Sequence, residues 1–201
     1  MKPSGRPWTA DQGRLIYENP WISLREFQAG APTGASTIYG VVAFRNLAIG
    51  VLPIYDDGTV VLVGQHRFPA ADYSWEIPEG GVPIDADPLD GARRELREEA
   101  GLDASDWRQV LQYQLSNSVT DERGIGYIAT GLSQVPPDPD ATEEFALARV
   151  PFLEALEQAT AGRIQDVITV AILLRAYHMA REGMLPGALA QAMLERKGES
   201  R

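Results

Sequence analysis

Along the first fifty residues, short hydrophobic runs of β-type alternate with polar, turn-forming stretches. Two β-type runs near the start, WISLREF and TIYGVVAF, are separated by the turn-forming stretch GAPTGAS. Further on, IGVLPIY and TVVLVGQHRF flank Asp56-Asp57-Gly58, which is a strong hairpin signal. The stretch YSWEIPEGG is interpreted as a strand that runs into a glycine-rich loop. We therefore expect several short strands before the first helix.

The period changes to that of a helix after residue 87. Asp87 can cap the helix, and Pro88 suits its first turn. Gly101 suits a left-handed C-cap, where the missing side chain removes a steric penalty. An apolar stripe recurs at spacings of three and four, at Leu89, Ala92 and Leu96. This pattern predicts a helix that starts at residue 88 and ends before Gly101.

The rest of the chain combines strands and helices. Strand-like WRQVLQYQL and IGYIATGL flank the polar loop SNSVTDERG, and the loop PPDPDATEE precedes FALARVPF. Helices are expected over Leu153–Thr160, Asp166–Arg181 and Leu189–Arg196. Strands on either side of a helix, with more helices at the end, predict the α/β class with a mixed sheet covered on both faces.

The amino-acid composition limits the kinds of metal site that the chain can form. The 201 residues suit one domain, and 44% hydrophobic with 23% charged residues is the balance of a globular protein with a real core. The absence of cysteine excludes disulfides and thiolate metal sites. His66 and His178 lie far apart in sequence and are expected to be structural or exposed. Oxygen ligands remain, and these favour hard cations such as Mg²⁺ or Mn²⁺.

Net charge and hydropathy argue against nucleic acid and membranes as binding partners. A formal charge of −10 argues against free nucleic acid, which binds basic surfaces. The N-terminus has no apolar core of signal-peptide type, and the hydrophobic run VITVAILL is far too short to span a bilayer. We expect a cytoplasmic protein that binds neither nucleic acid nor membrane.

Acidic residues concentrate in the predicted helix, where Glu95, Glu98 and Glu99 stand at i, i+3 and i+4. At about 100° per residue, the three carboxylates project within one arc beside the apolar stripe. Arg94 lies next to them and can pin a carboxylate or a loop carbonyl. Such a face can bind divalent cations, and the alternative is a solvated charged surface.

The stretch from Gly80 to Leu102 resembles the Nudix box, G-x5-E-x7-R-E-U-x-E-E-x-G-U, where U is a bulky aliphatic residue. Every specified position matches except one, because Ala86 stands where the family has its first glutamate. The resemblance implies a Nudix α/β/α sandwich with a mixed sheet over residues 48–201. It also implies an N-terminal β-rich extension over residues 1–47 that forms a homodimer.

The resemblance also implies site roles. Glu95 and Glu99 would be the principal ligands of Mg²⁺, with Mn²⁺ as an alternative, and Glu98 would assist them or activate water. Arg94 would orient Glu95 or Glu98, and the backbone near Gly80 would add a carbonyl ligand. The general base stays open, with Glu144 ahead of FALARVPF as the first candidate; its rivals are Asp121 and Glu122.

Three residues are assigned to substrate binding by the same resemblance. Arg67 in QHRFP would hold a phosphate or terminal ribose, although a surface arginine paired with an acid fits equally well. Trp21 would stack on a base, sometimes across a dimer, against the alternative of simple packing. Glu76 belongs to WEIPEGG, which looks like the lead-in of the ADP-ribose and nucleotide-sugar branch.

The implied reaction is hydrolysis of a small molecule linked to a nucleoside diphosphate. ADP-ribose, giving AMP and ribose 5-phosphate, is the first choice. The marker proline that many ADP-ribose enzymes carry beyond the box is absent, because residues 117–119 read Asn-Ser-Val. Another nucleotide sugar of the GDP-mannose type therefore stays open, as does a Nudix domain that binds nucleotides without hydrolysing them.

Overall fold

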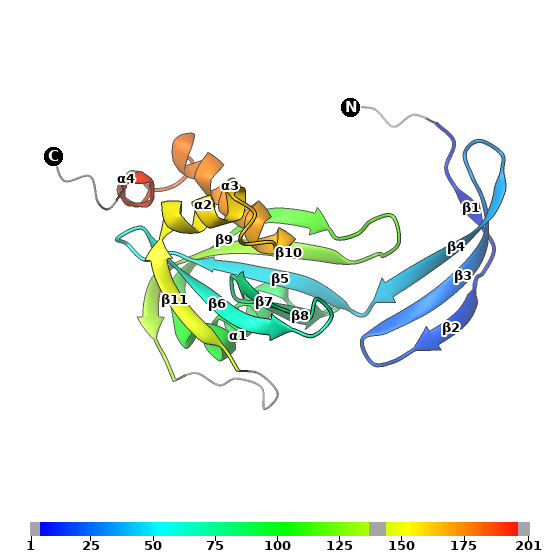
Figure 1. Cartoon of the computed structure of the whole chain (residues 1–201), viewed down its shortest axis with the longest axis horizontal. Helices are drawn as coiled ribbons and strands as arrows, with labels where there is room; N and C mark the ends of the chain where they lie inside the picture. The colour runs from blue at the N-terminus through cyan, green and yellow to red at the C-terminus, as the bar shows by residue number, and fades with distance from the viewer. Residues whose placement is uncertain (1–4, 137–143, 197–201) are drawn as a thin grey trace.

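The computed structural model describes residues 5–136 and 144–196. Figure 1 shows an elongated molecule, in which a main body of strands and helices carries a projecting sheet at its N-terminal end. The projecting sheet belongs to the first forty-four residues, and the remaining strands and all four helices form the main body.

The N-terminal sheet has four antiparallel strands centred on β3. β1 and β2 pair in succession along one edge of β3, and β4 pairs along the whole of the other edge. The apolar runs WISLREF and TIYGVVAF lie mainly in β3 and β4, so the alternation predicted these strands. The strands are β1 (Thr9–Ala10), β2 (Arg14–Glu18), β3 (Ile22–Gly30) and β4 (Ser36–Phe44).

The main body contains the expected mixed sheet, in the order β8-β5-β10-β9. β5 and β10 run parallel, whereas the other two pairs are antiparallel. Alternate residues of β5 contribute to two cores: Ile49 and Val51 join the core under α1, whereas Leu52, and Ile54 just after the strand, join the core under α2 and α3. The sheet is thus covered on both faces, as the α/β prediction required. Its strands are β5 (Asn46–Pro53), β8 (Glu79–Pro83), β9 (Leu102–Gln114) and β10 (Arg123–Gln134).

A second, antiparallel sheet of the main body has the order β11-β6-β7. Its strands are β6 (Thr59–Arg67), β7 (Asp72–Glu76) and β11 (Ala146–Pro151). The hairpin expected around Asp56-Asp57-Gly58 is only partly correct. The turn is present, with the Tyr55 N–H donating to the Thr59 carbonyl at 2.9 Å, but β5 and β6 then separate into different sheets. Both strands are buried, so each pairs with other partners instead of continuing a two-stranded ribbon.

The helices agree with the sequence patterns to within a few residues. α1 has Asp87 as its N-cap, whose side chain accepts a hydrogen bond from the Leu89 N–H, and ends at Gly101 with φ 61°. The last helix begins and ends two residues earlier than expected. No helix in the described ranges is long and apolar enough to cross a membrane. The helices are α1 (Pro88–Ala100), α2 (Phe152–Thr160), α3 (Val167–Arg181) and α4 (Gly187–Leu194).

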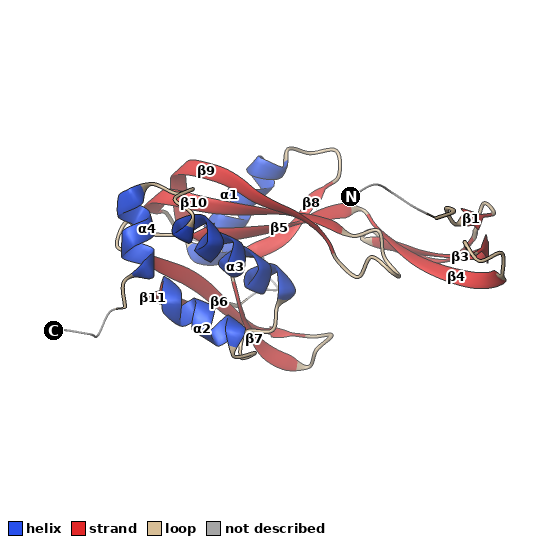
Figure 2. Cartoon of the chain, turned by 90° about the horizontal axis from the view of Figure 1, so that it is seen from above, coloured by secondary structure: helices blue, strands red, loops and turns tan. Residues whose placement is uncertain are grey.

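The view from above shows α1 on one side of the mixed sheet and α3 on the other (Figure 2). The stretch YSWEIPEGG was predicted to run from a strand into a glycine-rich loop. The loop part of this prediction is wrong, because Gly80 and Gly81 lie inside β8 and pair with Ile49 and Ala48. The two glycines are therefore strand residues, and their missing side chains make space for neighbours.

Candidate active site

One ridge of α1 faces the edge strand β8 and carries two of the predicted carboxylates. Gly91, Glu95 and Glu99 follow at spacings of four and are all buried, with Glu95 6% and Glu99 5% exposed. A side chain at Gly91 would meet Val82 of β8 at 2.9 Å, so this glycine lets the helix approach the strand. The ridge places two acids at the border of the core.

Gly80 makes the space that Glu95 occupies. A Cβ atom at position 80 would lie 2.2 Å from Glu95 Oε1 and 2.5 Å from its Oε2. The carboxylate therefore lies directly against the backbone of β8. Glycine at the start of the Nudix-like box is thus explained by close approach of a charged side chain.

Arg94 connects the acids of α1 to β8. Its guanidinium contacts Glu95 at 2.5 Å and Glu98 at 2.6 Å and donates to the Gly81 carbonyl at 2.9 Å. Burial works to lower the Arg94 pKa, but the charges of Glu95 and Glu98 raise it above its ordinary value. The arginine thus remains a cation that contacts both glutamates. Glu98 itself is partly exposed, with 26% of its side chain accessible.

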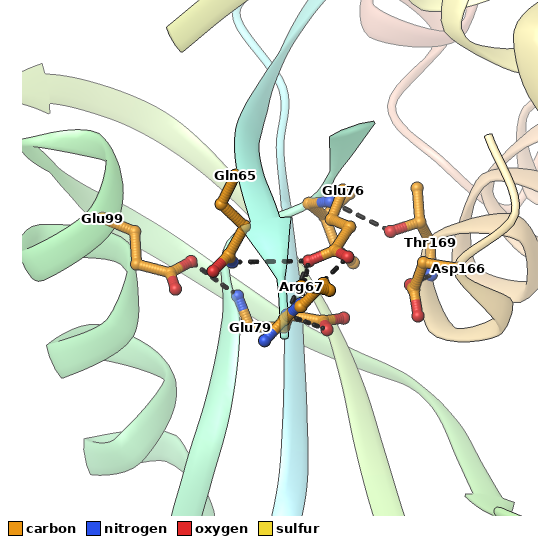
Figure 3. A network of polar contacts seen from close by, with 8 residues as sticks. Gln65, Arg67, Glu76, Glu79, Glu99, Asp166 and Thr169 are labelled. Carbon is orange, nitrogen blue, oxygen red and sulfur yellow. Dashed lines mark hydrogen bonds and ion pairs between the residues drawn. The ribbon is translucent and has the colours of Figure 1, made fainter. Parts of the chain in front are cut away.

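The other side of β8 carries a second charged network, drawn in Figure 3. The Arg67 Nε–H donates to both oxygens of Glu76, at 3.1 and 3.0 Å, and Arg67 Nη2 contacts Glu76 Oε2 at 2.5 Å. Arg67 Nη2 also donates to Glu79 Oε1 at 2.7 Å. Burial opposes the charge on Arg67, but the hydrogen bond and charge of Glu76 and the charge of Glu79 raise its pKa. Arg67 is therefore paired with acids and held at the site.

Glu79 joins the two networks. Its backbone N–H donates to Glu99 Oε2 at 2.9 Å, while its side chain contacts Arg67. Burial raises the pKa of the Glu79 carboxyl, and the charges of Asp166 and Glu76 raise it further. Glu79 Oε2 is one of two buried side-chain polar atoms without a hydrogen-bond partner in the described part of the chain; the other is the Tyr113 hydroxyl.

A hollow of about 290 Å³ lies where the N-terminal sheet meets the main body. It brings together three predicted site residues, Trp21, Arg67 and Gly80, which are far apart in sequence. Glu79 and Glu122 line it as well. Trp21 is 64% exposed, so its ring is accessible to a ligand and is not part of the core.

A neighbouring hollow of about 490 Å³ shares Arg67 and Glu79 with the first. Glu76, Arg163 and Asp166 also line it. Asp166 caps α3 by accepting from the Thr169 N–H at 2.6 Å. Arg67 and Glu79 therefore lie at the border between two ligand-sized spaces.

The three candidates for the general base lie in different surroundings. Glu144 is exposed just before β11 and is not among the residues that line either hollow. Asp121 accepts from the Phe44 N–H at 2.8 Å and so ties the β9–β10 loop to β4. Glu122 lines the first hollow, and burial followed by the charge of Asp121 raises its pKa.

The structure also places His66, Trp75 and Ala86. His66 is exposed and makes an edge contact with Tyr73, with 5.0 Å between ring centroids. Trp75 is partly buried and packs against the core. Ala86, the departure from the box, is exposed in the loop between β8 and α1.

Two site residues were missed. Glu79 stands directly before Gly80 in WEIPEGG, and that position was the available signal. Thr169 is fully buried, and its hydroxyl accepts from the Ile77 N–H at 3.0 Å, a contact between residues 92 positions apart that no local pattern indicates.

The donor set suits a hard divalent cation. Glu95 and Glu99 present carboxylate oxygens on adjacent turns of α1, and Gly80 lets Glu95 lie against the backbone of β8. In the described ranges, no group of three or more His, Cys, Asp or Glu side chains is placed to hold a metal ion by itself. The arrangement is thus a pair of buried carboxylates beside β8.

Comparison with known proteins agrees with this geometry. The Nudix domain model matches residues 44–169. An ADP-ribose pyrophosphatase of Mycobacterium tuberculosis is 31% identical over 172 residues, which cover 84% of this chain and 82% of that protein. A CMP-5'-(N-acetyl-N-hydroxy-3-aminopropyl)phosphonate hydrolase of Streptomyces rubellomurinus is 26% identical over 90% of this chain and 87% of its own length.

A crystal structure described as an ADP compounds hydrolase has the same fold. It matches with a TM-score of 0.80 at 17% identity and covers 92% of this chain and 100% of its own. The family model alone spans more than half of the chain, from the last residue of β4 into α3. The chain therefore belongs to the Nudix family and is a Nudix hydrolase.

Proposed function

We propose that this enzyme hydrolyses the diphosphate linkage of a nucleoside diphosphate sugar, with ADP-ribose as substrate and AMP and ribose 5-phosphate as products. The observation that carries the proposal is the buried Glu95–Glu99 pair beside Gly80. Arg67 lies on the other side of β8 from this pair and lines the hollow of about 290 Å³. The similarity to an ADP-ribose pyrophosphatase over most of both chains supports the choice of substrate.

Glu95 and Glu99 would hold Mg²⁺ or Mn²⁺, with Glu98 and the backbone at Gly80 as further ligands. A bound divalent cation supplies positive charge to the diphosphate oxygens and activates water. Arg94 keeps Glu95 and Glu98 in place through its two contacts. The Glu79 N–H does the same for Glu99.

Arg67 would bind a phosphate or the terminal ribose, and Glu76 would hold Arg67 in position for it. Trp21 would stack on the nucleobase, because it is largely exposed at the same hollow as Arg67. Among the candidate bases, Glu122 is supported by its place in the hollow. Glu144 stays a prediction, and its removal would test it against Glu122.

The test is a screen of ADP-ribose, GDP-mannose and other nucleotide sugars with Mg²⁺, with products separated by chromatography. We expect AMP and ribose 5-phosphate from ADP-ribose, and no product after chelation with EDTA. Faster release of GMP from GDP-mannose would reassign the substrate. Tight binding without turnover of any compound would indicate a nucleotide sensor and refute hydrolysis.

We also propose that the N-terminal sheet joins two copies of the chain. The sheet projects from the main body (Figure 1), and large hydrophobic residues are exposed on it. Burial of such residues in a second copy would remove apolar surface from water. Light scattering should give the mass of a dimer, and a monomer mass would refute this. The exposed residues are Trp8, Leu15, Ile16, Tyr17 and Ile38.

A further inference from the structure

Glu79 occupies a position where a charged side chain is costly. Only 11% of its side chain is exposed, its Oε2 atom is buried without a hydrogen-bond partner, and Glu76 and Glu99 lie close by. A buried carboxylate that is only half satisfied costs stability. A residue needed only for packing at this position would not be an acid.

The Glu79 side chain completes the binding of one edge of Arg67. A guanidinium has five N–H donors, of which one is on Nε and two are on each Nη. Glu76 accepts hydrogen bonds from the Nε–H and from one N–H of Nη2, and Glu79 Oε1 accepts a hydrogen bond from the second N–H of Nη2. These bonds use the whole Nε–Nη2 edge and leave the two donors of Nη1 for a substrate oxygen.

The Glu79 backbone acts on the other half of the site. Its N–H donates to Glu99 Oε2 at 2.9 Å, so one residue touches both the arginine and a predicted metal carboxylate. In Figure 3, Glu79 lies between Glu99 on one side and Arg67 with Glu76 on the other. A displacement of Glu79 would therefore change the spacing between the cation site and the arginine.

We propose that Glu79 is a positioning residue for hydrolysis, which acts through Arg67 by fixing the guanidinium so that Nη1 faces the substrate. This inference rests on the proposed function, because it takes Arg67 as the residue that binds the diphosphate sugar. The side chain supplies the orientation, whereas the contact to Glu99 comes from the backbone and is kept in any substitution other than proline.

A double-mutant cycle tests the proposal, with Arg67→Ala, Glu79→Ala and the pair measured on ADP-ribose with Mn²⁺. Loss of a charge-assisted hydrogen bond that orients Arg67 should raise KM about tenfold to a hundredfold in Glu79→Ala, with kcat within about threefold of wild type. The double variant should match Arg67→Ala alone, because Glu79 acts only through that arginine. Glu79→Gln keeps an acceptor for Nη2 and should restore KM to within about threefold of wild type.

Two controls separate positioning from general damage. Mn²⁺ affinity, measured by electron paramagnetic resonance, should stay unchanged in Glu79→Ala because Glu95 and Glu99 are intact. Asp103→Ala removes an acid paired with Arg97 at 3.4 Å, away from both hollows, and should leave KM unchanged. Additive effects in the cycle, or a Glu79→Gln variant as impaired as Glu79→Ala, would overturn the proposal.

The same cycle is measured on the Kd for ADP-ribose by calorimetry with Ca²⁺. A wild-type protein that binds ADP-ribose without hydrolysing it would refute the proposed function, while non-additivity in Kd would still support the role of Glu79. A wild-type protein that neither binds nor hydrolyses ADP-ribose would overturn both.

Discussion

Replacement of Gly80 by alanine should separate the stability of the fold from binding of the cation. Gly80 lies in β8 with ordinary strand geometry, so the backbone tolerates a side chain there. The new methyl group would nevertheless lie 2.2 Å from Glu95 Oε1, a distance that real Cβ atoms essentially never show. The strand is fixed by its pairing with β5, so the carboxylate has to move.

The size of the effect follows from that distance. Glu95 Oε1 has to retreat by about 0.8 Å to bring the contact from 2.2 to 3.0 Å, and a misplacement of about 1 Å can cost about a hundredfold in rate. The cost to the fold is small by comparison. Arg94 has 46% of its side chain exposed, so it can follow the shift of Glu95 and keep their contact. Exchange of glycine for alanine at an unstrained backbone position returns about 0.4–1 kcal/mol.

The assay combines urea unfolding, Mn²⁺ titration and product release from ADP-ribose. Gly80→Ala should unfold within about 1 kcal/mol of wild type and lose at least about tenfold in Mn²⁺ affinity. Gly81→Ala is the matched control on the same strand, because its methyl group would meet the Asn46 side chain, with Nδ2 nearest at 2.8 Å, instead of Glu95. A Gly80→Ala protein that binds Mn²⁺ like Gly81→Ala would refute the assignment of Glu95 as a ligand.

Three further predictions concern single side chains. Glu99→Gln keeps an acceptor for the Glu79 N–H but removes the charge, so activity should fall by about a hundredfold or more while the thermal midpoint is unchanged; retained activity would exclude Glu99 as a ligand. The raised pKa of Glu122, caused by burial and then by Asp121, means that the native state binds a proton more readily than the unfolded state. Stability should therefore fall as pH rises from the ordinary carboxyl pKa through the raised one, and Glu122→Gln should remove that part of the slope in unfolding measured against pH. Thr169→Val leaves the buried Ile77 N–H without its acceptor and should cost about 1–3 kcal/mol in urea unfolding, whereas Thr169→Ser should restore most of it.

Local patterns predicted the elements of the fold well. The caps of α1, strands β3 and β4 of the N-terminal sheet and the three final helices follow from spacing and from the conformational preferences of individual residues, whereas β1 and β2 were not predicted. The pairing of those elements could not be read in the same way. The turn at Asp56-Asp57-Gly58 is correct, yet β5 and β6 belong to different sheets, because β5 pairs with β8 and β10 whereas β6 pairs with β7 and β11.

The candidate site shows the same division. The spacing of Glu95 and Glu99 predicted that they share a face of α1, and both are buried there. The spacing could not show that Glu98 points further outward than they do, since this depends on where β8 lies. Glu79 was missed because its importance comes from Arg67, twelve residues earlier, on a strand of another sheet.

The position of the site follows from a change of sheet within one short segment. β7 pairs with β6, whereas β8, only two residues later, pairs with β5 of the other sheet. The Ile77 N–H lies at this change and donates to Thr169 of α3. Because the segment crosses from one sheet to the other, Glu76 reaches Arg67 on one side and Glu79 reaches both Arg67 and Glu99 on the other. Two charged networks from separate sheets thus meet over the four residues from Glu76 to Glu79, which places the proposed cation site next to the arginine that is proposed to bind the substrate.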